Sequence, residues 1–438
     1  MFDRKKPEVL IVGAGPIGLF AALVLAKRGI RVQVVDKDWR PAAHSYGLAL
    51  HAHALDLFEE VGLLGRILER AYRVRTIGFY DGASRRAEMH ISDLGEDFSF
   101  LAVMTQDVLE NLLEDELRHC GVKVLWNHQV SQLVPREDYV SVTIGRLEKE
   151  SMGYAVAHME WFVAKSTVLK VPFVIGADGH LSDTRRALQI DFPDLGGTQH
   201  FAVFEFKTDA DLQHEMRVVM DDRTTNVLWP LPDGYCRWSF ELDDYEVPAS
   251  TRSKGDLLVE LGTARFSMLT EDNLRALIAK RAPWFTGSIE RLRWRIVVRF
   301  ERRLASAFGR GRTWLAGDAG HVTGPVGVQS MNVGFHEAHN LAGIIADVLQ
   351  GQTSPERLHT YNEERLAEWR YLLGLDGTLK AGAQADPWIR RHSERFLPCI
   401  PASGEDFVRL ARQVGIDPSG LDSAKRRNVA TPEGHLLH

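Results

Sequence analysis

The sequence predicts a mixed α/β protein in which a Rossmann-like domain carries an inserted antiparallel sheet and is followed by a mostly helical part. Three observations lead to this fold class. Residues 8–36 contain a strand, a glycine-rich turn, a helix and a second strand, which is the order of a βαβ unit. Residues 200–242 contain short strands with alternating apolar side chains. The chain after about residue 365 has helical periodicity in part.

The composition is that of an ordinary globular protein. The chain has 438 residues, 45% of them hydrophobic, and its 53 basic and 59 acidic side chains give a net charge of −6. Global disorder is excluded, and without a basic excess we expect no nucleic-acid partner. The three cysteines (Cys120, Cys236 and Cys399) are isolated, which argues against a disulfide framework or a metal site. We find no apolar run of about 18 residues and no signal peptide, so we expect a cytoplasmic chain without a membrane span.

The N-terminal elements alternate between strand and helix. Strands are predicted at 8–12 and 30–35, because both segments are short, apolar and rich in β-branched residues. The Ala- and Leu-rich stretch between them predicts a helix over 19–28. Two further helices are expected over about 50–60 and 103–120, each followed by a glycine.

The middle of the chain is predicted to be mostly strands. They lie at 122–126, 139–145, 161–168, 173–177, 201–207, 227–231 and 235–242, and the first four form a small β-meander that returns to the main sheet. In the last strand Trp238 and Phe240 lie on one side. Arg237 and Glu241 lie on the other side, so we expect one buried and one half-exposed face.

Towards the C-terminus we expect a helix over about 254–282, a strand at 313–316 and a long helix over 334–349. Two groups of side chains have two interpretations each. The aromatic residues of the second sheet are either its core or a lid over a ligand: Phe204, Phe206, Trp229, Trp238 and Phe240. The arginines of the tail form either a solvated face, which we favour, or a partner site: Arg390, Arg391, Arg395, Arg409 and Arg412.

The turn after the first strand carries the strongest motif. It has the sequence GAGPIG, in which Gly13 permits the tight turn, Gly15 leaves room for a pyrophosphate and Gly18 lets helix and strand pack closely. The N-terminus of the following helix, at Pro16–Ile17, offers N–H groups to the phosphates. Asp36 ends the second strand, where a carboxylate accepts from ribose hydroxyls. The pattern predicts a dinucleotide site and fits FAD and NAD alike.

Two later segments separate these cofactors. The first has the sequence VIGADGHLSDTR over 174–185, and the second has GRTWLAGDAGH over 311–321, followed by a proline and an MNVG helix start. In this order the motifs resemble the flavin-dependent aromatic hydroxylases, the single-component group A monooxygenases similar to para-hydroxybenzoate hydroxylase. The resemblance implies a glutathione-reductase-type FAD domain and NADPH or NADH as reductant. It also implies insertion of one oxygen atom from O2, through a flavin C4a-hydroperoxide, into a phenolic or polycyclic aromatic substrate.

The resemblance also implies roles for single residues. The residues expected to bind FAD or to shape its site are Gly13, Gly15, Pro16, Ile17, Gly18, Asp36, Lys37, Gln106, Asp178, Ser182, Arg185, Asp318, Met331 and Asn332. Asp318 would accept from the ribityl hydroxyls, and Gln106 stands where the family has a flavin-contacting glutamine. The catalytic candidates are Pro325 and Gly327, in the loop beside the ring, and His321, for which a structural role stays open. No metal is implied, since the cofactor carries the chemistry.

The chain departs from the family pattern at several positions. Tyr46 and His53 stand where arginines are usual, so Lys37 or Arg40 is expected to supply charge to the phosphates. Side chains also occur where the flavin-side loop usually has glycine, namely Val328 and Ser330, and Glu337 replaces the usual aspartate. FAD binding is compatible with these changes, whereas their effects on flavin movement and NAD(P)H access stay open.

We divide the chain by these motifs. The FAD-binding domain is assigned to 1–75, 105–185 and 290–365, the substrate-binding domain to 76–104 and 186–289, and a helical C-terminal region to 366–438. We expect a monomer or homodimer that acts on a small aromatic molecule. A flavin reductase without oxygen insertion and a non-catalytic FAD-binding protein stay open, whereas the WxWxIP motif of flavin-dependent halogenases is missing from the sequence.

Overall fold

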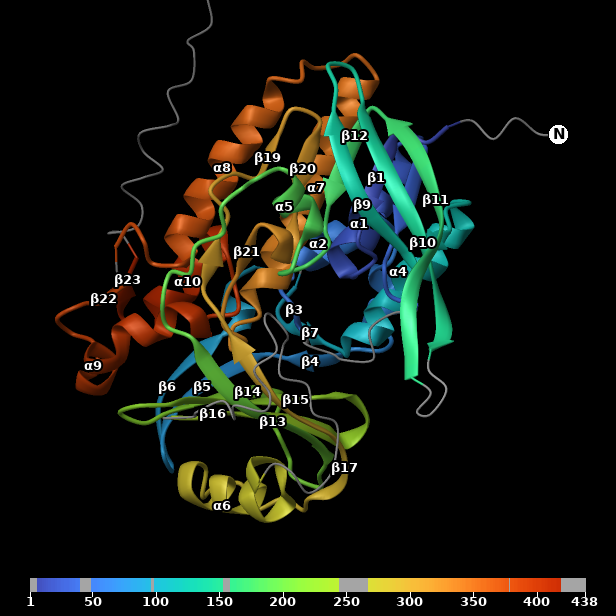
Figure 1. Cartoon of the computed structure of the whole chain (residues 1–438). Coiled ribbons are helices and arrows are strands. Elements are labelled where there is room, and N and C mark those ends of the chain that lie inside the picture. Colours follow the sequence, from blue (N-terminus) through green and yellow to red (C-terminus); the bar gives the residue numbers. More distant parts are fainter. Residues whose placement is uncertain are drawn as a thin grey trace, which may run out of the picture.

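The computed structural model of the chain describes residues 6–39, 49–95, 98–152, 158–243, 267–377 and 379–418 (Figure 1). Arg40, Tyr46 and the first half of the helix expected over 254–282 lie outside these ranges. Within them, the fold is the predicted combination of a parallel sheet, a second and mostly antiparallel sheet, and C-terminal helices.

The parallel sheet lies at the centre of the first domain. Its strand order is β19-β20-β12-β1-β2-β8, and all neighbours are parallel except β19 and β20, which are antiparallel. The strands are β1 (Val9–Val12), β2 (Val32–Val35), β8 (Val124–Leu125), β12 (Phe173–Gly176), β19 (Gly309–Arg310) and β20 (Thr313–Leu315). All four residues of β1 and of β12 are buried, because both faces of the sheet are covered.

Helices cover one face of this sheet and a β-meander covers the other (Figure 1). The helices are α1 (Pro16–Lys27), α4 (Gln106–His119) and α7 (Gln329–Leu349), with α2 (Ala52–Glu60), α3 (Leu64–Leu68) and α8 (Arg357–Leu372) around them. The meander consists of β9 (His128–Pro135), β10 (Val140–Met152) and β11 (His158–Val171), in the order β11-β10-β9. Apolar residues of β9 and β10 pack on Leu10 and Val12 of β1. The predicted meander is therefore confirmed only in its two middle strands: the strands predicted at 122–126 and 173–177 belong to the parallel sheet as β8 and β12, and β9 was missed.

The second sheet has seven strands in the order β17-β13-β16-β15-β14-β5-β6. They are β5 (Thr76–Asp81), β6 (Ser84–His90), β13 (Gln199–Lys207), β14 (Glu215–Met220), β15 (Thr225–Pro230), β16 (Tyr235–Glu241) and β17 (Glu290–Phe300). All neighbours are antiparallel except β5 and β14, which are parallel. The sequence-based boundary at residue 290 assigned β17 to the FAD-binding domain, whereas it pairs with β13 in this sheet.

The prediction that one face of this sheet is half-exposed was wrong. One face packs on α6 (Glu271–Arg281), and it contains Phe204, Phe206, Trp238 and Phe240, which are therefore core residues and not a lid. The opposite face contains Trp229 and is buried as well, so that Arg237 is only 3% exposed. It packs against a three-stranded sheet in the order β3-β7-β4 and against the C-terminal helices. The strands of that sheet are β3 (Ala49–Leu50), β4 (Tyr72–Val74) and β7 (Leu101–Val103).

The C-terminal part is helical, as predicted. It contains α9 (Pro387–Phe396) and α10 (Gly404–Gln413), and the short strands β22 (Lys380–Ala381) and β23 (Ile416–Asp417) pair beside them. Four of the five arginines of the tail are exposed and Arg395 is half-buried, which fits a solvated face. No helix in the described ranges is both long and apolar enough to cross a membrane.

Candidate functional site

The glycine turn lies at the carboxyl end of β1. Gly13 has a φ of +104°, and a Cβ atom there would lie 2.2 Å from the carbonyl oxygen of Ala177. A Cβ atom on Gly18 would lie 2.1 Å from the carbonyl oxygen of Gly13. At Gly15, in contrast, a Cβ atom would meet no atom within 4 Å. Two of the glycines are therefore needed for packing within the protein, while Gly15 faces open space.

Helix α1 begins directly behind this turn. Gly15 is its N-cap, and Pro16 occupies the first turn, where its missing N–H costs no hydrogen bond. Ile17 packs against the glycines of two other segments, since Cβ atoms on Gly317 and Gly334 would lie 3.0 Å and 2.9 Å from its side chain. The N–H groups at the start of α1 are thus placed beside the open side of the turn.

Asp36 follows β2 and holds the glycine turn. Its Oδ2 atom accepts from the backbone N–H of Ala14 at 2.6 Å, and its Oδ1 atom accepts from the N–H of Asp38 at 2.8 Å. Burial raises the pKa of Asp36, and the two backbone N–H groups oppose this shift. A carboxylate offers about four acceptor positions, so further donors such as ribose hydroxyls can be accommodated.

A pocket of about 210 Å³ opens at this edge of the parallel sheet. It is lined by six of the residues predicted to bind the cofactor, namely Gly13, Gly15, Asp36, Lys37, Gln106 and Asp178. Trp126 and His128, which follow β8, also line it and were missed. Because β8 lies beside β2 in the parallel sheet, the residues after its carboxyl end reach the same edge. The strand predicted at 122–126 could have identified Trp126 and His128, because they lie at or just after its carboxyl end.

The turn after β12 is built around Asp178. Its Oδ1 atom accepts from the hydroxyl of Ser182 at 2.6 Å, and its Oδ2 atom accepts from the backbone N–H and the hydroxyl of Thr184. Ser182 in turn caps the helix α5 (Asp183–Ala187) by accepting from the N–H of Arg185. The carboxylate of Asp178 therefore fixes the turn that borders the pocket.

Arg185 joins this turn to the second flavin motif. Its guanidinium donates to the carbonyl oxygen of His180 at 2.8 Å and to that of Ala319 at 2.7 Å. Burial lowers the pKa of Arg185 to about 10. It does not line the pocket around Asp36, and its observed contacts connect two loops that are more than 130 residues apart in the sequence.

Asp318 lies in the 3₁₀ turn η5 (Gly317–Ala319) after β20, with its carboxylate exposed. Its Oδ1 atom accepts from the hydroxyl of Ser330, in the first turn of α7, at 2.7 Å. The same hydroxyl lies 3.2 Å from Nδ1 of His321, which belongs to β21 (His321–Val322). His321 is fully buried, and its Nε2 atom lies 3.0 Å from Oε2 of the equally buried Glu337.

The start of α7 is tied to the rest of the molecule from two sides. Asn332 donates to the carbonyl oxygens of Ala49 and Val328 and accepts from the N–H of His51. Gly327 approaches the C-terminal segment so closely that its Cβ atom would lie 2.8 Å from the carbonyl oxygen of Pro398. The helix begins at Gln329, earlier than the predicted position 334.

The remaining predicted residues lie in the same loop. Pro325 is half-buried between β21 and α7, and Met331 packs against the cores of both domains. His51, which was not predicted, places its Nε2 atom 3.0 Å from the carbonyl oxygen of Gly327. Burial lowers the pKa of His51 to about 3, so that the ring is neutral and donates from Nε2. Its Nδ1 atom is buried without a partner among the described residues.

The residues of this site fit FAD. The open side of Gly15, the start of α1 and the carboxylate of Asp36 match the needs of a pyrophosphate and a ribose. The exposed carboxylate of Asp318 matches a polyol chain, and the start of α7, with its partial positive charge, matches a ring edge that carries negative charge. Bound FAD would supply the redox chemistry, and the chain itself would supply binding and orientation.

Comparisons with known proteins agree with this geometry. A 6-methylpretetramide 4-monooxygenase from Streptomyces rimosus is 29% identical over 380 residues, which are 86% of this chain and 62% of the relative. A pentachlorophenol 4-monooxygenase from Sphingobium chlorophenolicum is 27% identical over 83% of this chain and 63% of its own length. This chain thus spans about three fifths of the length of these relatives.

A solved structure extends the likeness to the fold. The p-nitrophenol 4-monooxygenase from Pseudomonas putida DLL-E4 superposes with a TM-score of 0.69 and 20% identity, covering 96% of this chain and 97% of that one. This agreement confirms the predicted fold class. Residues 6–373 match the family described as FAD binding domain, and the chain therefore belongs to that family of FAD-binding flavoproteins.

Proposed function

We propose that the protein is an FAD-dependent monooxygenase that uses NAD(P)H and O2 to hydroxylate a phenolic or polycyclic aromatic compound. The balanced reaction consumes substrate, O2, NAD(P)H and a proton, and it yields hydroxylated substrate, water and NAD(P)⁺. One observation carries the proposal. The fold brings six predicted cofactor residues from four separate segments, Gly13–Gly15, Asp36–Lys37, Gln106 and Asp178, to one pocket.

The chain would bind each part of FAD with different groups. The start of α1 and Asp36 would hold the pyrophosphate and ribose, and Asp318 would accept from the ribityl hydroxyls. The start of α7 would direct its partial positive charge to the ring, which favours negative charge there. Enclosure of the ring between α7 and the second sheet would exclude water from the reacting atoms.

The face of the second sheet that contains Trp229 is the proposed wall of the substrate site. Its apolar residues share one packed cluster with Val326 and Val328 of the loop before α7, so this face meets the expected ring position. The same face carries Glu205, whose carboxylate accepts from Arg237 at 2.6 Å and from Nε of Arg293 at 2.7 Å. The aromatic and phenolic compounds named for the relatives support an aromatic substrate.

The reaction is tested by following NAD(P)H oxidation and O2 uptake with a panel of phenols, and by measuring product mass. We expect a gain of one oxygen atom in the product. Turnover that does not need O2 would instead identify a flavin reductase, and no NAD(P)H oxidation with any phenol would favour a non-catalytic FAD-binding protein.

Asp318→Ala tests the cofactor assignment. Loss of a charged acceptor is expected to lower FAD affinity about tenfold or more, as measured by flavin fluorescence on titration of the apoprotein. Asp347→Ala, which removes an exposed carboxylate paired with Arg28 on the outer part of α7, is the matched control. Full FAD retention by Asp318→Ala would show that the ribityl assignment is wrong.

A further inference from the structure

A chain of hydrogen bonds leads from the flavin site into the protein interior. It begins at the exposed Asp318, passes through the hydroxyl of Ser330 and the ring of His321, and ends at Glu337. The Oε2 atom of Glu337 also accepts from the N–H of Gly317, and its Oε1 atom accepts from the indole of Trp369 at 2.6 Å. The carboxylate is therefore surrounded by donors at a position that is fully buried.

The ring of His321 is held in one orientation. The indole of Trp369 stacks on it with 3.7 Å between ring centres and an angle of 18°. Its two nitrogens consequently face fixed partners, Nδ1 the Ser330 hydroxyl and Nε2 the Glu337 carboxylate.

The number of protons follows from the distances. Ser330 has one hydroxyl hydrogen and lies closer to Asp318, at 2.7 Å, than to His321, at 3.2 Å. If the hydroxyl donates to Asp318, Nδ1 of His321 must donate to the hydroxyl oxygen. A second proton must then lie between Nε2 and Glu337, since two acceptors would otherwise face each other at 3.0 Å. In this arrangement each contact of the chain has one donor and one acceptor.

We infer that Ser330, His321 and Glu337 are positioning residues for Asp318, which they hold at the flavin site through this hydrogen-bond chain. The hydroxyl of Ser330 holds the Asp318 carboxylate, the ring of His321 holds that hydroxyl, and the buried carboxylate of Glu337 holds the ring. A side chain without a hydroxyl at position 330 would break the link between Asp318 and His321, so FAD affinity would fall.

Other charged and titratable groups lie around this chain of hydrogen bonds. Tyr361 and Arg365 of α8 interact electrostatically with Glu337, and the Tyr361 hydroxyl donates to the carbonyl oxygen of Leu315. His180 interacts with Asp318, and Arg185 donates to the carbonyl oxygen of Ala319. The strand next to His321, β18 (Arg303–Leu304), carries Arg303, which pairs with Glu301.

The hydroxyl at position 330 is the link on which this chain of hydrogen bonds depends. A glycine or an alanine at 330 has no hydroxyl, so Asp318 and His321 would have no link. The inference rests on the proposed FAD site, and it assigns Ser330, His321 and Glu337 a part in holding Asp318 there.

The test is a titration of apoprotein with FAD, followed by flavin fluorescence. Ser330→Ala removes the hydroxyl that joins Asp318 to His321, so we expect the dissociation constant of FAD to rise about tenfold, the size of one hydrogen bond to a charged group. Thermal unfolding of the same apoprotein separates this effect from a loss of folding.

Three further variants complete the experiment. Ser330→Thr keeps the hydroxyl and should restore the FAD affinity, while Ser330→Gly should bind FAD as weakly as Ser330→Ala. Ser92→Ala removes a comparable bond to Asp93 on the surface and should leave the FAD affinity unchanged. The inference fails if Ser330→Ala binds FAD as tightly as the unchanged protein, or if Ser330→Thr binds it as weakly as Ser330→Ala. An unchanged protein that binds no FAD would contradict the proposed function itself.

Discussion

His51 shows how one buried side chain makes stability depend on pH. In the folded protein it is neutral, with a pKa of about 3, because burial disfavours the charged ring. In the unfolded chain the ring has its ordinary pKa of 6.5. Its contribution to stability is therefore complete above pH 6.5 and is lost as the pH falls towards 3.

Acidification from pH 7 to pH 5 should accordingly cost about 2 kcal/mol of unfolding free energy through His51 alone. His51→Gln keeps a donor for Gly327 but cannot titrate. Its unfolding free energy should therefore fall by about 2 kcal/mol less than that of the unchanged protein between pH 7 and pH 5. Urea unfolding of the apoprotein at both pH values measures the difference. His119→Gln, whose ring is 75% exposed, is the control. Equal losses in His51→Gln and the unchanged protein would contradict the assignment.

Substitutions of two neighbouring glycines in the glycine turn should have different effects on stability and on FAD affinity. Gly15→Ala places a methyl group where no protein atom lies within 4 Å, so stability should change by less than about 1 kcal/mol. The same methyl group occupies the expected pyrophosphate position, and FAD affinity should fall at least about tenfold. Gly13→Ala meets the carbonyl oxygen of Ala177 at 2.2 Å and should lower stability and FAD affinity together. Thermal unfolding and FAD titration of both variants separate the two effects.

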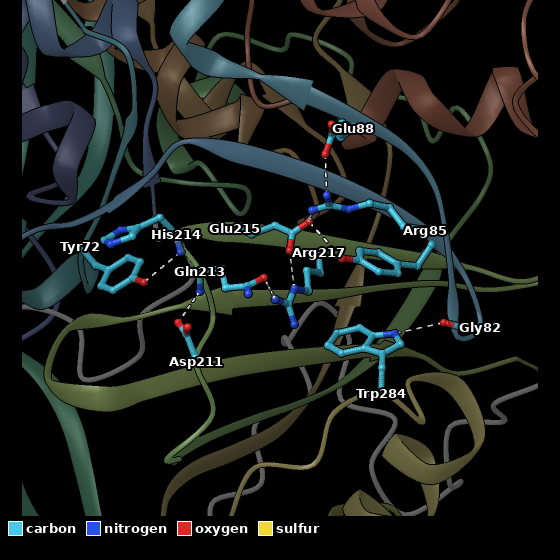
Figure 2. A network of polar contacts seen from close by, with 11 residues as sticks. Tyr72, Gly82, Arg85, Glu88, Asp211, Gln213, His214, Glu215, Arg217 and Trp284 are labelled. Atoms are coloured by element: carbon cyan, nitrogen blue, oxygen red, sulfur yellow. Dashed lines mark hydrogen bonds and ion pairs between the residues drawn. The ribbon is translucent and has the colours of Figure 1, made fainter.

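At the scale of elements, one ion-pair network holds the place where two distant hairpins join. Strand β5 runs parallel to β14, with Thr76 paired to Glu215, so Glu215 lies at this junction. Figure 2 shows Arg85 from β6, Arg217 from β14 and the Tyr80 hydroxyl converging on its carboxylate. Arg217 also lies 4.7 Å from the ring centre of Trp284, which donates to the carbonyl oxygen of Gly82.

Glu215 should be far more sensitive to substitution than its exposed neighbour. It is 1% exposed, so Glu215→Gln leaves a buried guanidinium without its counter-charge and should cost about 3–5 kcal/mol of stability. Glu88→Gln, which removes a 40% exposed carboxylate from the same Arg85, should cost less than about 1 kcal/mol. Urea unfolding compares the two variants, and equal losses would show that the network does not stabilise the junction.

The Glu215 network explains why strand β14 and the burial of both faces of the second sheet could not be predicted from the sequence. The predicted strands were those in which apolar and polar residues alternate, or in which apolar residues are continuous. Strand β14 places Glu215 and Arg217 in the buried sheet, and an alternation rule assigns such residues to the surface. The buried Arg237 opposite Glu205 misled the interpretation of β16 in the same way. Charged pairs that neutralise each other between strands are invisible until the pairing of the strands is known.

The cofactor motifs were predictable because each is local. The glycine turn, the Asp178 turn and the Gly317–Asp318 turn carry their geometry within a few residues, and the structure places the first two at one pocket. The chain from Asp318 to Glu337 was not predictable, since it depends on how β21 and α7 pack. Three of its members were recognised only as departures or as an undecided histidine.

For the molecule as a whole, the proposed FAD site draws on residues from Gly13 to Asn332, so bound FAD would connect segments that are far apart in the sequence. FAD at 100 times its dissociation constant should stabilise the protein by about 2.7 kcal/mol and raise the unfolding temperature by several degrees. FMN, which lacks the adenosine half, should give a smaller rise because the pocket at Asp36 stays unused. Thermal unfolding with each flavin at the same concentration measures this, and equal rises would contradict the site at Asp36.

The C-terminal segment supports the loop before α7, at the proposed flavin site, although it contains none of the flavin motifs. The carbonyl oxygen of Pro398 accepts from the N–H of Gly327, and those of Leu397 and Ile400 accept from the side chain of Gln329 at the first residue of α7. Cleavage or deletion of this segment would remove the acceptors for Gly327 and Gln329 and so destabilise the loop before α7. Truncation of the last helices should therefore weaken cofactor binding and, at the same time, expose the face of the second sheet on which these helices pack.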